Sequence, residues 1–306
     1  MNNILILGNG FDLDLGLKTK YSDFAASDEW KVCANEESNL YKYLEGKNKP
    51  DRWFDLEAEL LNYATTINPS SMTFKDILKE DELYFNQLHE GIKIFLDKQQ
   101  LIGINVDSCA AKLLKAVVEN GLFRNIYSFN YTNLNIYAKQ LGIEIESKCN
   151  YIHGSLSDAS HILGVNEDKI ADGYGFLRKT MSSHYRPHNL FEDLKAADEV
   201  IFFGLSFGEI DFHYFEDFFK NLINKDVALR KKKHVTLFTK DESSRKEFLF
   251  KLDSKGIKPK ELFSQSDFRW IRTFPSSEED MDTLNKLFER LKKYNYSNTL
   301  ISRLIS

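Results

Sequence analysis

The stretch NILILGNGFD, residues 3–12, decides the fold of this chain. Its apolar run, Ile4 to Leu7, has the length of a buried strand and breaks at Gly8 and Gly10. Glycines directly after a strand let another group approach the backbone closely, and phosphate is the usual ligand of such a turn. Asp12 opposes that interpretation, because its negative charge would repel a pyrophosphate. The turn also lacks the third glycine of a dinucleotide fingerprint and the lysine of a P-loop.

Further apolar runs recur along the chain, and amphipathic helical stretches separate the later ones. We expect strands at 4–7, 125–129, 151–152, 162–165, 200–203, 235–238 and 270–272. The helical stretches cover about 210–224, 241–255 and 276–294. Continuously apolar strands that alternate with helices are typical of a mainly parallel sheet with helices on both faces. The sequence therefore predicts an α/β fold.

Residues 27–122 interrupt this alternation, since they contain several helical segments and no convincing strand. We interpret this block as a helical insertion after the first strand, forming a lobe or lid, and a role in oligomerisation is the alternative. The predicted domains are thus a core of residues 1–26 and 123–306 and an insertion of residues 27–122. Within it, Asp55 and Glu57 open a helix. In one interpretation these acids only stabilise the start of the helix. In the other, this edge of the insertion contacts a ligand or the core.

Composition narrows the functional classes. A net charge of −5 provides no basic field that would attract nucleic acid or a membrane. This charge, with no basic stripe, counts against a nuclease. The 3 cysteines form no CxxC pair, which favours a reducing cytoplasm and disfavours a structural zinc site. No apolar stretch is long enough to cross a membrane. We expect no signal peptide, because Met1, Asn2 and Asn3 provide no basic region and the apolar run that follows is short. We expect a cytoplasmic protein.

Small or polar residues follow four of the expected strands, at the edge where ligands of parallel sheets gather. The candidate binding residues are Gly8, Asn9, Gly10, Phe11 and Asp12 after the first strand and Gly204, Ser206 and Asp211 after 200–203, and the candidate catalytic residues are Asn130 and His153. His184 and His188 are four residues apart, but Pro187 disfavours a helical metal-binding pair there. The other histidines have no ligand-like spacing, so we predict no metal.

Each of these residues also has a structural alternative. Asp12 can cap a tight strand–helix turn or hydrogen-bond a ribose. Asn130 can tie down a turn, or its amide can hold a water or a sugar hydroxyl. His153 is either a structural histidine or a general base that the following glycine makes accessible. Asp211 can simply favour a helix start, whereas Gly204 and Ser206 suit a clamp for a nucleotide.

Several separate stretches resemble the abortive-infection AbiH family of bacterial phage-defence proteins. They are ILILGNGFDLDLGLKTKYSDF, WFDLEAEL, YSFNYT, IHGSL, ILGVNE and FFGLSFGEIDFHYF, spread over roughly residues 3–240. Lys18 departs from the pattern, because the family tends to have proline there. The resemblance implies an anti-phage effector of abortive infection.

At lower similarity the same motifs resemble sirtuin-like domains. Asn130 and His153 match their catalytic asparagine and histidine, and Gly204 and Ser206 match their later Gly-x-Ser turn. The zinc-binding cysteines of sirtuin deacylases are missing here, so NAD-hydrolysing sirtuin-like domains are nearer in kind. The resemblance implies a Rossmann-like core that hydrolyses NAD, or a related nucleotide, at the N-glycosidic bond.

A non-catalytic nucleotide-binding sensor of a phage-defence system is the alternative. The expected partners are a nucleotide ligand and either a second copy of the chain or a phage-derived trigger. Apart from the resemblance, Asp12 or Asp211 can stabilise the cation formed when the bond to nicotinamide breaks.

Overall fold

The computed structural model describes residues 2–48, 55–67, 74–121, 123–166, 170–224, 232–275 and 277–305. Its centre is a six-stranded sheet of order β3-β2-β1-β4-β5-β6, in which every neighbouring pair is parallel. The strands are β1 (Asn3–Leu7), β2 (Phe123–Ser128), β3 (Lys148–Tyr151), β4 (Glu199–Phe203), β5 (His234–Thr239) and β6 (Asp267–Arg272). The order is that of a doubly wound Rossmann-like sheet, which changes direction between β1 and β4. The α/β prediction is confirmed.

The strand register brings the polar residues that follow β1 to β4 to one edge. Leu7 pairs with Ser128 on one side and with Phe203 on the other, and Ser128 pairs with Tyr151. These pairs lie at the carboxyl ends of their strands, so the segments that follow all leave the sheet at the same level. The switch point between β1 and β4 lies within this edge, where ligands of doubly wound folds bind.

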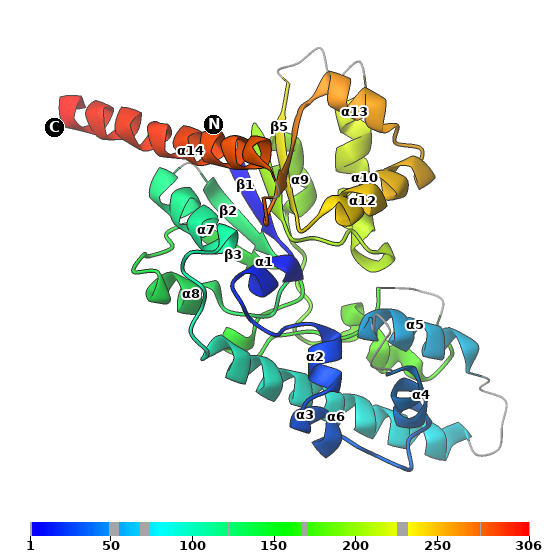
Figure 1. The fold of residues 1–306 in the computed structure, drawn as a ribbon. Coiled ribbons are helices and arrows are strands. Elements are labelled where there is room, and N and C mark those ends of the chain that lie inside the picture. The colour runs from blue at the N-terminus through cyan, green and yellow to red at the C-terminus, as the bar shows by residue number, and fades with distance from the viewer. Residues whose placement is uncertain are drawn as a thin grey trace.

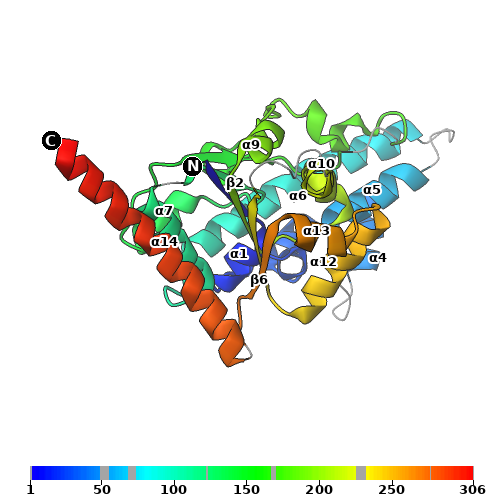
Figure 2. The same ribbon diagram turned by 90° about the horizontal axis from the view of Figure 1, so that it is seen from above.

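Side-chain alternation along β1 explains why both faces of the sheet are covered. Leu5 and Leu7 enter one apolar cluster and Ile4 and Ile6 enter another, because successive side chains of a strand point to opposite faces. The first cluster is formed with α1 (Asn9–Asp14), α7 (Cys109–Asn120), α8 (Leu134–Gln140) and α14 (Glu278–Ile305). The second is formed with α9 (Leu190–Ala196), α10 (Glu209–Ile223), α12 (Glu242–Ser254) and α13 (Pro259–Gln265). Figure 2 shows the two helix layers on opposite sides of the sheet.

The strand expected at residues 162–165 is wrong. Val165 forms only an isolated bridge to Arg178, and the side chains of Leu163 and Val165 pack among helices rather than in the sheet. A four-residue apolar run has no periodicity that separates a strand from any other buried segment. At the bridge, a Cβ on Gly164 would lie 2.3 Å from the Leu177 carbonyl oxygen, so glycine is needed where the two backbones meet.

A helical lobe lies beyond the carboxyl ends of the strands, in the lower part of Figure 1. Its helices are α2 (Tyr21–Ala25), α3 (Asp28–Val32), α4 (Asn39–Lys47), α5 (Leu56–Thr66) and α6 (Phe74–Gln100). They share one apolar cluster with residues of the short helices η1 (Leu156–Asp158) and η2 (Tyr174–Leu177). The helix α7, which the sequence-based division assigns to the insertion, packs instead in the cluster of the sheet. The division into domains stays a prediction.

A buried carboxylate organises the polar interior of this lobe. Asp81 on α6 is fully buried and accepts hydrogen bonds from the Tyr63 hydroxyl at 2.5 Å and the Tyr174 hydroxyl at 2.6 Å. Its other oxygen accepts from the Ser38 hydroxyl and the Leu40 amide, both at 2.8 Å. Three of these donors lie in or beside α4 and α5, which precede β2, and the fourth lies in η2, which follows β3. Asp81 therefore joins the two parts of the chain that build the lobe.

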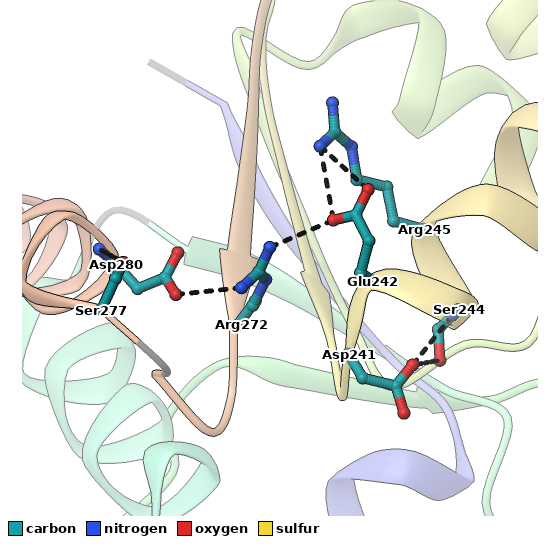
Figure 3. A network of polar contacts seen from close by, with 7 residues as sticks. All are labelled: Asp241, Glu242, Ser244, Arg245, Arg272, Ser277 and Asp280. Atoms are coloured by element: carbon teal, nitrogen blue, oxygen red, sulfur yellow. Dashed lines mark hydrogen bonds and ion pairs between the residues drawn. The ribbon is translucent and has the colours of Figure 1, made fainter.

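Arg272 at the end of β6 connects the last helices to the sheet, as Figure 3 shows. Its guanidinium donates to Glu242 at 3.2 Å and to Asp280 at 3.3 Å, near the starts of α12 and α14. At the opposite end of the sheet, Arg290 on α14 forms a two-pronged ion pair with Glu199 on β4. Among the described residues, no helix is long and apolar enough to cross a membrane.

Candidate functional site

The turns after β1 and β4 interlock backbone to backbone at the switch point. The Gly8 amide donates to the Phe203 carbonyl at 2.9 Å, and the Gly10 amide donates to the Gly204 carbonyl at 2.8 Å. A Cβ on Gly10 would lie 2.6 Å from the Gly204 Cα, and one on Gly204 would lie 2.5 Å from the Gly10 Cα. Gly204 also has a φ of +68°, which favours glycine. The partner that approaches these glycines so closely is therefore the other turn.

Two of the other candidates in the first turn have internal roles. The Asn9 side chain exchanges hydrogen bonds with Thr19, donating to its carbonyl at 3.2 Å and accepting from its hydroxyl at 2.5 Å. Phe11 is fully buried and packs edge-on against Phe203, with ring centroids 5.6 Å apart. These contacts fix the course of the loop and of α1.

Asp12 on α1 is a buried carboxyl group behind the glycine turn. Only 1% of the residue is exposed, and its Oδ2 accepts a hydrogen bond from the Thr132 hydroxyl at 2.7 Å. Burial raises its pKa from 3.8 to about 7, although the hydrogen bonds of Thr132 and Asn130 oppose the rise. Its Oδ1 is buried and accepts no hydrogen bond from the described part of the chain. Near neutral pH Asp12 can therefore hold or release a proton.

Asn130 ties the end of β2 to the glycine turn. Its side-chain amide donates to the Gly8 carbonyl oxygen at 3.0 Å, and its backbone amide donates to the Ser128 hydroxyl at 3.1 Å. The side chain is thus held in one orientation at the switch point. The structural role of tying down a turn is therefore real for Asn130.

His153 and Asp211 form the pair with the clearest chemical meaning. His153 Nε2 lies 3.2 Å from Asp211 Oδ1, and His153 is only 6% exposed. Phe129 packs edge-on against the imidazole, with centroids 5.5 Å apart, which limits how the ring can turn. Burial alone would raise the pKa of Asp211, but the hydrogen bond and charge of His153, helped by Lys179 and His213, lower it. An ionised carboxylate that orients an imidazole is the arrangement of a general base.

The structure therefore brings the candidates together in two neighbouring groups. Gly8, Gly10, Gly204 and Asn130 form the first, with Asp12 behind it. His153 and Asp211 form the second, and Phe129, the residue before Asn130, packs against the His153 ring. Ser206 stands apart, exposed in the loop before α10.

Lys179 and Tyr131 of this region escaped the sequence-based assignment of the site, and both contact Glu57. Lys179, in the short helix η3 (Lys179–Met181), is buried and donates to Glu57 Oε2 at 2.9 Å. The Tyr131 hydroxyl donates to the Ile162 carbonyl at 3.0 Å and lies 3.4 Å from Glu57 Oε1. Glu57, near the start of α5, thus joins the lobe to the core, as one of the two interpretations of this helix start predicts. Nothing in the sequence around Lys179 indicates burial.

A cavity of about 490 Å³ opens beside the turn that holds His153. Its polar lining includes Ser155, Ser157, Asp158, Ser160, His184 and Arg186. No three His, Cys, Asp or Glu side chains gather in a possible metal site within the described ranges.

A doubly wound parallel sheet, with an oriented imidazole at its switch-point edge and a helical lobe beyond that edge, defines a Rossmann-like protein with a candidate ligand site. A model of one protein family matches residues 4–231, and its description is bacteriophage abortive infection AbiH. The chain belongs to this family, and its role is accordingly in bacteriophage abortive infection. No curated protein matches the chain.

Proposed function

We propose that this protein is an effector of abortive infection that hydrolyses NAD, or a related nucleotide, at the N-glycosidic bond. The observation that supports this most is the His153–Asp211 pair beside the rigidly held Asn130, at the switch point of the sheet. Asn130 and His153 are also the two residues for which the sequence-based resemblance to sirtuin-like domains implies catalytic roles, an expectation that the family match does not address.

The chemistry of NAD suits this small set of groups. Nicotinamide leaves as a neutral molecule when the bond from ribose C1′ breaks and its electron pair returns to the ring nitrogen, so no general acid is needed. The ribose becomes oxocarbenium-like in the transition state, and water then attacks C1′. His153 accepts the proton of that water, and Asn130 orients the water or a ribose hydroxyl. The products are nicotinamide, ADP-ribose and a proton.

The two acidic candidates differ in their suitability for stabilising the developing cation. Asp211 has a lowered pKa and is ionised at neutral pH. Asp12 has a pKa of about 7 and is therefore only partly ionised there. We assign the stabilising charge to Asp211, which also orients His153.

Incubating the pure protein with NAD and following nicotinamide by chromatography tests this proposal. We expect wild-type protein, alone or from phage-infected cells, to release nicotinamide, and Asn130→Ala and His153→Ala to lose most of that release. His234→Ala is the matched control, because His234 pairs with Asp267 at the amino end of β5, across the sheet from the site. The proposal fails if wild type and the two site variants release equal amounts.

A nucleotide-binding sensor is the second candidate, because the hydrogen bonds between the turns give this edge of the sheet a rigid frame. The Gly8 and Gly10 amides and the Asn130 side-chain amide donate within the protein, so a nucleotide would be held by other groups of the site. Calorimetry distinguishes the two functions, since a sensor would bind NAD or ADP-ribose without turnover, with an affinity that His153→Ala leaves nearly unchanged. For either function we propose action in the cytoplasm, in response to a phage-derived trigger or through assembly with a second copy.

A further inference from the structure

Two histidines from distant parts of the chain stack on each other where the helical lobe meets the turn of His153. The imidazole rings of His89, on α6, and His161 have centroids 3.9 Å apart and planes within 12° of parallel. His89 Nε2 lies 2.9 Å from the His161 carbonyl oxygen, and His161 Nε2 lies 3.3 Å from the His89 carbonyl oxygen. We call these two side chains the imidazole stack. Each residue thus contacts the ring and the backbone of the other.

These contacts require both rings of the imidazole stack to be neutral. A carbonyl oxygen only accepts hydrogen bonds, so in each neutral ring Nε2 carries the proton and Nδ1 carries a lone pair. His161 is only 3% exposed, and its Nδ1 is buried without a hydrogen-bond partner in the described part of the chain. A proton added there would create a buried, charged N–H group that has no acceptor. Protonation of both rings would place two cations face to face at 3.9 Å.

The surroundings of the imidazole stack also favour the neutral form. Burial lowers the pKa of both rings, and that of His161 falls to about 4. The other titratable groups that act on the stack are Glu90, Lys93 and Asp97 on α6, His184 before α9, and Tyr131, whose ring packs edge-on against His161. The two carboxylates and the backbone hydrogen bonds oppose the lowering, whereas Lys93 and His184 add to it.

The imidazole stack is connected to the backbone of His153. The amide of Ile162, the residue after His161, donates to the His153 carbonyl oxygen at 2.8 Å. The chain folds back tightly between them, because a Cβ on Gly154 would lie 1.9 Å from the Ser160 carbonyl oxygen. An unbroken series of contacts therefore runs from His89 on the lobe, through His161 and Ile162, to His153.

We propose that His89 and His161 are positioning residues for His153, and that they hold its turn against the lobe only while both of their rings are neutral. Protonation of the imidazole stack then loosens residues 153–162. The change stays local, since Leu156 and Leu163 also pack in the apolar cluster of the lobe. This inference rests on the proposed function only in treating His153 as the base.

The direction of the pH dependence follows from proton binding. In the loosened turn His161 titrates near the ordinary value of 6.5, so the intact stack binds fewer protons than the loosened turn. The intact form is therefore fully favoured above about pH 6.5 and becomes less stable as the pH falls toward 4. At neutral pH the turn of His153 is held in place.

Amide hydrogen exchange of Ile162 in the full chain, followed by NMR and corrected for the intrinsic effect of pH, tests this proposal. We expect the protection of this amide in wild type to fall at least about tenfold between pH 7.5 and pH 5. His161→Phe keeps an aromatic ring in the stack but takes up no proton, so its protection should change less than about twofold. His234→Ala, which lacks a histidine at the amino end of β5, is the matched control and should behave as wild type.

Two results would overturn the proposal. One is equal protection of Ile162 in wild type at both pH values. The other is the same loss of protection in His161→Phe, because that variant retains His153 and its loss would then have another cause.

A titration of the imidazole signals of wild type keeps the test decisive if His161→Phe does not fold. The ¹⁵N shifts of His161 should show the neutral form protonated at Nε2 at pH 7.5. Uptake of a proton by His161 should coincide with the loss of Ile162 protection. Loss of protection while His161 is still neutral, or a protonated His161 with full protection, would contradict the proposal.

The pH profile of nicotinamide release provides a second readout. Below about pH 6 release by wild type should fall more steeply than release by His161→Phe, because the variant keeps the turn of His153 in place. Hydrogen exchange needs no substrate, so it still decides the inference if the wild-type protein releases no nicotinamide. Failure of the proposed function and failure of this inference are therefore separable.

Discussion

Replacing Gly204 with alanine tests the interlocked turns at the switch point. Gly204 has a φ of +68°, and an added Cβ would lie 2.5 Å from both the Cα and the carbonyl carbon of Gly10. The left-handed backbone costs alanine about 1–2 kcal/mol. Forcing a methyl group into a packed site adds about 1–3 kcal/mol. We therefore expect Gly204→Ala to lower the free energy of unfolding by about 2–5 kcal/mol.

Gly142 offers a matched control for the steric part of this cost. Its φ is +67°, but a Cβ there would meet no atom within 4 Å. Gly142→Ala should therefore lose only the conformational part, about 1–2 kcal/mol. Urea unfolding of wild type and both variants, followed by circular dichroism, measures the difference. If Gly204→Ala is no less stable than Gly142→Ala, the two turns do not pack as described.

Three further predictions concern the carboxyl groups of Asp12, Asp81 and Asp211. Because the pKa of Asp12 is 3.8 unfolded and about 7 folded, its contribution to stability is complete below about pH 4 and declines as pH rises toward 7. The stability lost between these pH values approaches about 4 kcal/mol. Asp12→Asn removes the titrating group, so the free energies of unfolding at pH 4.5 and 7.5 should differ less in the variant than in wild type. Asp81→Asn should destabilise the lobe by about 2–5 kcal/mol, because the two carboxylate oxygens of Asp81 accept four hydrogen bonds. Limited proteolysis should then cut the lobe of the variant before the sheet. Equal resistance of variant and wild type to the protease would contradict this. Asp211→Asn should slow nicotinamide release about 10²–10⁴-fold with little change in NAD affinity, and a loss of affinity alone would argue against its role at His153.

Most of the sheet is predictable from the sequence, because buried parallel strands are apolar runs bounded by polar residues. The expected strands at 4–7 and 200–203 differ from β1 and β4 by one residue at the amino end. The expected strand at 151–152 overlaps β3 only at Tyr151, since β3 lies at the sheet edge and its residues Lys148 to Asn150 are polar or small. The run 162–165 is as apolar as a strand, and its burial against the lobe is a tertiary effect that no local pattern contains.

The sequence places the candidate residues at one edge of the sheet, but it does not give their contacts. The glycines after β1 and β4 indicate a close approach, but the sequence does not say that each turn approaches the other. His153 and Asp211 are 58 residues apart, and only the parallel topology brings them together. Lys179 has no local signal, because a lysine in an irregular segment is usually exposed, and its burial depends on Glu57, which lies 122 residues earlier.

The central claim, that a nucleotide binds at the carboxyl ends of β1 to β4, is tested most directly by a crystal structure of His153→Ala with NAD. This variant should bind NAD without cleaving it. We predict that the nicotinamide ribose lies between Gly10, Asn130 and residue 153. NAD bound elsewhere, for example in the cavity lined by Ser157 and Arg186, or no bound NAD at saturating concentration, would contradict the account.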